Sequence, residues 1–169
     1  MDESEPIIKT YIGKRGKMKG LEFKIILDKE GEILYNKHCW WINKTDNNHY
    51  YLYRTNNGRN ISFHREITGA AEGQEVDHIN RNTLDNCKNN LRFVTRSQNN
   101  MNQGLHGKNT SGHRGVHFNS YKKRWIARIK INNIRINIGT FLDYNLACNA
   151  YEEKAQELFG EYLGEVSNI

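Results

Sequence analysis

The sequence has 169 residues, enough for one ordinary domain or two small ones, so neither part can rely on a large apolar core. Its 25 Lys and Arg outnumber its 19 Asp and Glu, a balance that favours a polyanionic partner. Three widely spaced cysteines with no Cys-x-x-Cys pair argue against a disulfide framework and against a structural zinc site. No apolar run is long enough for a membrane span and the acidic start lacks signal-peptide features, so we expect a cytoplasmic protein with no membrane partner.

Positive charge is concentrated in one long stretch of the chain. No Asp or Glu occurs from Asn86 to Leu142, whereas lysines and arginines recur throughout. A solvated surface normally mixes both signs. This stretch, with charges of one sign, therefore indicates a nucleic-acid-binding surface rather than a basic surface without a binding function.

The first third of the chain is predicted to form a small antiparallel β layer. Residues 21–35 show two β-rich runs around Asp28–Gly31, which has the composition of a hairpin turn, and Asn57-Gly58 marks a later turn. The aromatic residues at 40–41 and 50–53 are assigned to core packing. The basic stretch 14–19 either contacts phosphates or keeps a loop solvated, and the sequence favours neither.

The stretch from Val76 to Asn99 has the order strand, polar loop, strand, helix. The strands are predicted at 76–80 and 91–95, and Thr95-x-x-Gln98 fits a capping box that starts a helix near residue 96. A helix packed across such a hairpin would bring Asn99 back beside Asp77 and His78.

These residue types suit phosphodiester hydrolysis. A hard divalent ion prefers oxygen ligands, and the Asp77 carboxylate and the Asn99 amide can supply them. A neutral imidazole is well matched to deprotonating water, so His78 is the candidate base. Neighbours on a regular strand point to opposite faces, so we expect irregular backbone at His78. The Asn90 amide is suited to hold the loop through backbone hydrogen bonds.

The stretch from Val76 to Asn99 resembles a known family, the HNH (His-Asn-His) endonucleases with the ββα-metal fold, especially homing endonucleases of phages and mobile introns. The resemblance implies that Asp77 binds the metal, His78 activates water and Asn90 braces the loop. It also implies that Asn99 replaces the last His as second metal ligand, which favours one Mg²⁺ or Mn²⁺ ion over zinc. The resemblance is carried by residues 76–80, 84–86, 89–92, 94–95 and 98–99, and by Phe63-His64-Arg65 before them.

Three residues near this motif keep two interpretations each. His64 either caps local structure, which we favour, or contacts a phosphate. Arg92 and Arg96 either grip the phosphates that flank the cut or remain solvated, and these two roles are weighted equally.

A second module is predicted after a connector at residues 103–113, which is rich in Gly, Asn and Ser. Three strands are expected at 114–118, 124–131 and 134–138, with turns at Asn119-Ser120 and Asn132-Asn133. Asp143 is expected to cap a helix that ends before Gly160. The second and third of these strands alternate isoleucines with cationic residues and Asn137, which predicts one apolar face and one cationic face.

This module resembles the plant APETALA-two/ethylene-response-factor (ERF) DNA-binding domain, versions of which occur fused to HNH nucleases. The matching residues are 113–116, Trp125-x-Ala127-x-Ile129, 138–141, and Ala147 with Ala150-Tyr151. Several arginines of the plant domain are replaced here, so the resemblance implies the mode of docking on DNA but does not extend to base specificity. The resemblance implies DNA contacts at Arg114, His117, Asn119, Arg128, Lys130, Arg135 and Asn137.

The sequence therefore predicts an α+β protein with a β-rich region and HNH nuclease domain at 1–102 (motif about 60–102), a linker at 103–113 and a DNA-binding domain at 114–169. The leading hypothesis is a homing-type, divalent-metal-dependent endonuclease of a phage-infected or element-bearing bacterium. It would bind double-stranded DNA as a monomer and nick one strand. The competing hypothesis is a non-catalytic DNA-binding regulator on a degenerate nuclease scaffold.

Overall fold

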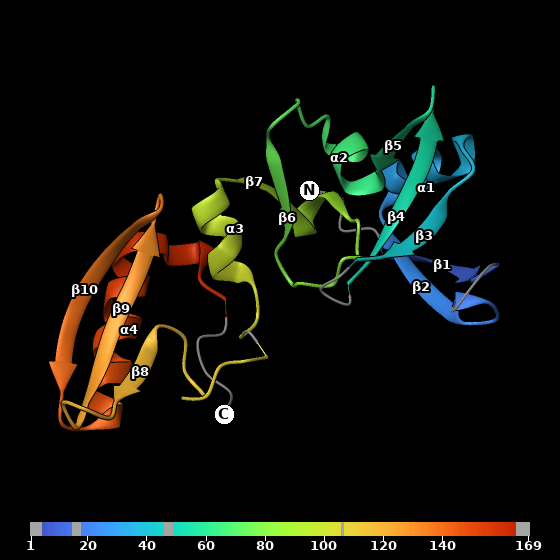
Figure 1. Cartoon of the computed structure of the whole chain (residues 1–169). Coiled ribbons are helices and arrows are strands. Elements are labelled where there is room, and N and C mark those ends of the chain that lie inside the picture. Colours follow the sequence, from blue (N-terminus) through green and yellow to red (C-terminus); the bar gives the residue numbers. More distant parts are fainter. Residues whose placement is uncertain (1–4, 15–17, 46–48, 106, 165–169) are drawn as a thin grey trace. The chain divides into compact units, whose positions relative to one another are not determined.

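The computed structural model describes residues 5–14, 18–45, 49–105 and 107–164, and it forms two compact units, 1–93 and 94–169 (Figure 1). The predicted α+β class is confirmed, because small antiparallel sheets and few helices make up both units. Residues 15–17 of the basic stretch lie outside the described residues.

The first unit begins with two antiparallel sheets and one buried cluster. The predicted turn at Asn57-Gly58 is confirmed, and both residues have positive φ. Trp40 and Phe63 pack edge to face in the core, with ring centroids 4.7 Å apart, so the packing role assigned to Trp40 is also confirmed. One sheet pairs β1 (Ile7–Ile12) with β2 (Glu22–Leu27), and the other has the order β3 (Trp41–Lys44), β4 (Tyr50–Asn56), β5 (Arg59–Ser62).

The predicted hairpin turn at Asp28–Gly31 is wrong. Helix α1 (Lys29–Lys37) begins there, and the Asp28 carboxylate caps it by accepting a hydrogen bond from Gly31 N at 2.8 Å. Two acidic residues, Glu30 and Glu32, lie in the first turn, where the helix dipole favours negative charge. Asp28, with Gly31 three residues later, therefore forms the N-terminal cap of a helix and not a hairpin turn.

The predicted order strand, loop, strand, helix is confirmed along residues 75–102. After the short helix α2 (Phe63–Thr68), strand β6 (Glu75–His78) pairs with β7 (Leu91–Val94), and α3 (Arg96–Asn102) follows. The predicted capping box is present: Gln98 N donates to Thr95 Oγ1 at 3.3 Å, and Thr95 N donates to Gln98 Oε1 at 2.8 Å.

The second unit contains the predicted three-stranded sheet backed by one helix. Strand β9 (Arg124–Ile131) lies between β8 (Val116–Asn119) and β10 (Ile134–Phe141), and all pairs are antiparallel. A two-residue turn at Asn132-Asn133, both with positive φ, joins β9 to β10 as predicted. Helix α4 (Tyr144–Phe159) is capped by Asp143 and ends at Gly160, also as predicted, and a short 3-10 turn (Gly160–Tyr162) follows.

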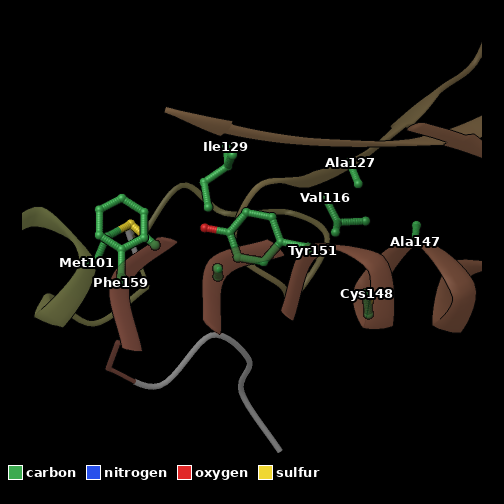
Figure 2. Close-up of a cluster of buried hydrophobic side chains, with 9 residues drawn as sticks. Met101, Val116, Ala127, Ile129, Ala147, Cys148, Tyr151 and Phe159 are labelled. Carbon is green, nitrogen blue, oxygen red and sulfur yellow. The ribbon is translucent and has the colours of Figure 1, made fainter. Parts of the chain in front are cut away.

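Helix α3 is part of this second unit. Its Met101 is buried in the same cluster as Phe159 of α4 and Ile129 of β9, and Figure 2 shows Met101 beside Phe159 at one end of that cluster. The division between the compact units falls between residues 93 and 94, before α3, and the predicted domain bounds around the connector at 103–113 stay a prediction. The physical reason is apolar burial, because Met101 has its partners on the C-terminal helix and sheet.

Two global features complete the fold. No helix in the described ranges is long and apolar enough to cross a membrane. All three cysteines are free thiols, with Cys87 and Cys148 buried and Cys39 exposed.

Candidate active site and nucleic-acid interface

Strand β6 delivers Asp77 and His78 into the interior of the first unit, where both are nearly inaccessible to solvent. The strand ends at His78, and the following turn includes Arg81 with a φ of +63°. Neighbouring side chains on a regular strand point to opposite faces, so one of them would be exposed if one face were solvated. Because the regular pleat stops at His78, the side chains of Asp77 and His78 can both be buried. The irregular backbone that was expected at His78 corresponds to the end of strand β6 at this residue.

Asn90 ties together the two ends of the polar loop. Its Oδ1 accepts a hydrogen bond from Asn80 N at 3.0 Å, and its Nδ2 donates to Asp85 O at 2.8 Å and to Asn80 Oδ1 at 3.0 Å. Asn90 O also accepts from Ile79 N at 2.9 Å. Asn90 is buried, so each of these polar atoms would be costly to leave unpaired. These are the contacts that a loop-bracing residue makes.

The loop is also anchored to β2, far away in sequence. Ile26 N donates to Leu84 O at 2.9 Å, and Asn86 N donates to Ile26 O at 2.8 Å. At the next turn Lys88 N donates to Asp28 Oδ2 at 2.7 Å. The loop is consequently held in place from the N-terminal strand layer, and Asn86 is held with it, 1% exposed.

His78 is surrounded by a carboxamide and two aromatic rings. Its Nε2 lies 3.3 Å from Asn86 Oδ1, and its ring centroid lies 5.1 Å from that of His64 and 6.1 Å from that of Tyr51. An amide oxygen can only accept, so in this contact Nε2 would carry the proton and Nδ1 would be the basic nitrogen. Sequence reasoning missed Asn86, because one asparagine in an asparagine-rich loop gives no signal of this tertiary contact.

Burial keeps both imidazoles of this cluster neutral. Desolvation lowers the pKa of His78, and the Asn86 contact and the Asp77 and Asp85 charges offset part of that shift. Desolvation, followed by the nearby His78 and Arg65, lowers the pKa of His64 to about 3. The His64 ring contacts the rings of Tyr51 and His78, with centroids 5.5 and 5.1 Å away, and its predicted capping role stays a prediction.

Asp77 forms a nearly buried ion pair with Arg92. Arg92 Nε and Nη2 donate to Asp77 Oδ2 at 3.2 and 3.1 Å. Arg92 thus lies inside the site, on β7, instead of on an outer surface. A carboxylate accepts about four hydrogen bonds or metal contacts over two oxygens, so this pair is compatible with a metal ligand at Asp77.

The Asp77 carboxylate offers oxygen atoms of the kind that a hard divalent ion binds. Within the described ranges, no three His, Cys, Asp or Glu side chains gather as a metal cluster. An ion such as Mg²⁺ does not need such a cluster, because amide oxygens, phosphate oxygens and retained waters complete its shell. Asn99 lies on α3 in the second unit, so its role as the other ligand stays a prediction.

The sheet of the second unit gathers most of the predicted DNA-contacting residues on one face. Ala127 and Ile129 are buried against α4, so the alternate residues of β9 point to the opposite face. Cross-strand partners share a face. The outer face, as we call it, therefore contains His117 and Asn119 from β8, Arg124, Arg128 and Lys130 from β9, and Arg135 and Asn137 from β10.

The pKa of His117 agrees with this proximity, and the strand pairing places one further cation, Arg124, on the outer face. The pKa of His117 is lowered by partial desolvation and then by the charges of Arg128 and Arg135. Arg124 was not among the predicted contacts, yet it pairs with Asn119 across the sheet. The positions of Arg124 and Arg128 on β9 differ by an even number, so the two residues share a face. This spacing is the sequence signal that could have identified Arg124.

Arg114 has a different environment from the outer face. Its Nη1 donates to Asn100 O at 2.7 Å, and its Nη2 donates to Gln103 O and, at 3.4 Å, to Gly104 O. A guanidinium beside the last carbonyls of α3 satisfies groups that a helix end leaves unpaired. The structure therefore gives Arg114 a fastening contact with α3, while DNA contact by Arg114 stays a prediction.

Comparison with known proteins adds three findings. Residues 66–101, which include Asp77, His78, Asn90 and Asn99, match the family model described as HNH endonuclease. Over 159 residues the chain is 32% identical to an uncharacterized HNH endonuclease of Acanthamoeba polyphaga mimivirus, a match that covers 90% of this chain and 79% of that relative. No solved structure matches the chain significantly.

Proposed function

Because the chain belongs to the HNH endonucleases, which depend on a divalent metal and act on DNA, we propose that it is a homing-type enzyme whose His78 activates water. The observation that carries this proposal is the buried, neutral His78 directly beside the Asp77 carboxylate, on a loop braced by Asn90. A buried imidazole whose pKa is lowered, beside a carboxylate, is typical of a catalytic site.

In this proposal His78 is the general base. Nδ1 takes a proton from the water that attacks phosphorus, while the bond from phosphorus to the 3′ oxygen breaks. The contact between Nε2 and Asn86 Oδ1, 3.3 Å apart, would hold the proton on Nε2 and orient the ring. A positioned base of this kind contributes roughly 10²- to 10⁴-fold to the rate.

We also propose that Asp77 and Asn99 hold one Mg²⁺ or Mn²⁺ ion. The bound ion would neutralise charge on a phosphate oxygen and on the departing 3′ oxygen. Arg92 keeps the Asp77 carboxylate oriented through Nε and Nη2, and it also lowers the cost of burying that negative charge. Asn90 holds the loop that follows Asp77 and His78 in one conformation.

The second unit is the proposed DNA-recognition module of the APETALA-two/ERF type. Its outer face offers cationic and amide side chains on a three-stranded sheet, which suits insertion into the major groove. A monomer with one such site would nick a single strand at each binding event. A site-directed endonuclease requires a catalytic site that hydrolyses the phosphodiester and a separate surface that recognises the DNA sequence.

Nicking of supercoiled plasmid tests the proposal. Plasmids that carry fragments of the native host genome are incubated with the protein and Mg²⁺ or Mn²⁺, with and without chelator. We expect metal-dependent nicking by the parent and by His49→Ala, an exposed histidine of the same unit, and none by His78→Ala or Asp77→Ala. Nicking by His78→Ala at the parental rate would show that the catalytic assignment is wrong.

A further inference from the structure

The sheet β3–β4–β5 of the first unit, seen in Figure 1, has a row of aromatic side chains on one face. Trp41 and Tyr53 lie directly opposite each other on β3 and β4, and their rings stack with centroids 5.4 Å apart and planes at 28°. The Tyr51 ring follows on β4, with its centroid 6.4 Å from that of Tyr53. We call these three residues the aromatic row.

The aromatic row points away from the apolar core. Ile42 and Leu52, the sequence neighbours of the row on β3 and β4, are buried in the core cluster, and successive residues of a strand point to opposite faces. Trp41, Tyr51 and Tyr53 are only half-buried, and among the described residues none of the three belongs to that cluster or packs against it. The core packing predicted for residues 40–41 and 50–53 therefore does not extend to the row.

The row ends at the histidine that is the proposed base. The Tyr51 ring centroid lies 5.5 Å from that of His64 and 6.1 Å from that of His78. The phosphodiester that is cut must lie beside His78 in the proposed function, so the nucleotides next to it must lie close to Tyr51. The aromatic row is therefore continuous with the place where the DNA strand has to bind.

The face that carries the row has no charged side chain on these three strands, all of which the structure describes. Strand alternation and pairing place on it Trp41 and Asn43 of β3, Tyr51, Tyr53 and Thr55 of β4, and Asn60 and Ser62 of β5. Flat aromatic rings stack on bases of any sequence, and amide and hydroxyl groups can bind base edges. Such a face fits the bases of a strand better than its phosphates.

We propose that the aromatic row stacks on unpaired bases of the DNA strand next to the phosphodiester that is cut. The inference rests on the proposed function and deepens it by naming a substrate class, DNA whose bases are unpaired beside the cut. In a duplex the faces of each base are covered by its neighbours, so the row reaches them only after a base leaves the stack. Because leaving the stack costs free energy, DNA that is already unpaired there should be the better substrate.

The binding test compares two single-stranded DNA probes with equal numbers of phosphates. An oligothymidine has bases, whereas an abasic oligonucleotide of the same length has none. The full-length protein is labelled with ¹⁵N and kept in chelator, and the indole N–H of Trp41 and the backbone amides of Tyr51 and Tyr53 report on the row. We expect oligothymidine to shift these signals saturably and the abasic probe to leave them unchanged. Equal shifts by both probes would overturn the inference, because the row would then respond to phosphates.

Variants identify the rings that bind. Trp41→Leu and Tyr53→Leu each remove one ring of the row, Trp41→Phe keeps a ring in place, and Tyr11→Leu removes a half-buried ring from β1 of the same unit. The amide of Tyr51 reports binding in all of them. We expect the two Leu variants of the row to bind oligothymidine roughly tenfold more weakly, and Trp41→Phe and Tyr11→Leu to bind it within about threefold of the parent. Equal losses in the row and in Tyr11→Leu would overturn the inference.

A cleavage test separates this inference from the proposed function. The cut strand of a site mapped on plasmid is annealed either to its full complement or to a complement that is mismatched beside the cut. We expect the parent and Tyr11→Leu to nick the mismatched substrate roughly tenfold faster, and Trp41→Leu to lose most of this preference. Metal-dependent nicking of both substrates at equal rates would overturn the inference and leave the nuclease proposal standing. Absence of nicking of either substrate would overturn the proposed function, while shifts by oligothymidine alone would still support stacking on the row.

Discussion

The two units treat their polar residues in opposite ways. The first unit buries Asp77, His78, Asn86 and Asn90 and gives them protein partners, whereas the second unit displays its cations on an exposed sheet face. Burial perturbs protonation and fixes geometry, which chemistry needs. Exposure keeps charges available to a long polyanion, which binding needs. This difference supports the proposal that the first unit cuts DNA and the second unit selects it.

The largest expected stability effect contrasts a buried asparagine with an exposed one. Asn90→Ala removes the partners of Asn80 N and Asp85 O, so it should cost about 2–4 kcal/mol in the first unit. Asn137→Ala, on the exposed face of β10, should cost less than about 0.5 kcal/mol. Amide hydrogen exchange, followed in each unit separately, measures both changes. Similar costs for the two substitutions would break the contrast.

A second effect contrasts two histidines under acid. The pKa of His64 is about 3 when folded and near 6.5 when unfolded, so the unfolded chain binds more protons between these values. Stability from a neutral His64 is therefore present above pH 6.5 and is lost as the pH falls toward 3. Between pH 7 and pH 5 the first unit should lose about 2 kcal/mol through this group.

Substitution identifies the group responsible. His64→Phe keeps an aromatic ring in the cluster and should remove that part of the pH dependence. His117→Phe is the matched control, because His117 is exposed on the outer face of the second unit and lies outside the first unit, whose unfolding is followed. Unfolding by urea at pH 7 and pH 5 gives the two differences. An unchanged pH dependence in His64→Phe would contradict the buried, neutral imidazole.

The smallest expected effect compares two helix starts. Thr95 caps α3 with its side chain, whereas Ser62 at the start of α2 makes no side-chain capping bond. Thr95→Ala should therefore cost about 1 kcal/mol, and Ser62→Ala clearly less. Protection of the α3 and α2 amides from hydrogen exchange reports each cap. Equal loss at both helices would show that the capping box does not support α3.

Much of this architecture could be predicted from local sequence. The alternation of isoleucines with polar and cationic residues predicted β9 and β10, and Asp143 and Gly160 predicted the limits of α4. These elements form through contacts between neighbours in sequence, so their pattern is visible in the sequence itself. The capping box at Thr95 was predictable for the same reason.

The remaining features depend on contacts between distant residues. The turn predicted at Asp28 was wrong because the true partner of β2 is β1, an earlier segment with no distinctive pattern. The contact between Asn86 and His78 exists only because the loop is anchored to Ile26. The position of α3 in the second unit follows from Met101 packing against Phe159, which lies far along the chain.

Single-turnover cleavage measured against protein concentration tests the separation of cutting from selection most directly. With Mg²⁺, His78→Ala should keep the parental half-saturating concentration while its maximal rate falls roughly 10²- to 10⁴-fold. Arg135→Ala should keep the maximal rate while its half-saturating concentration rises by about 5- to 150-fold, equivalent to about 1–3 kcal/mol. A parental maximal rate in His78→Ala, or a lowered maximal rate with unchanged half-saturation in Arg135→Ala, would contradict this account.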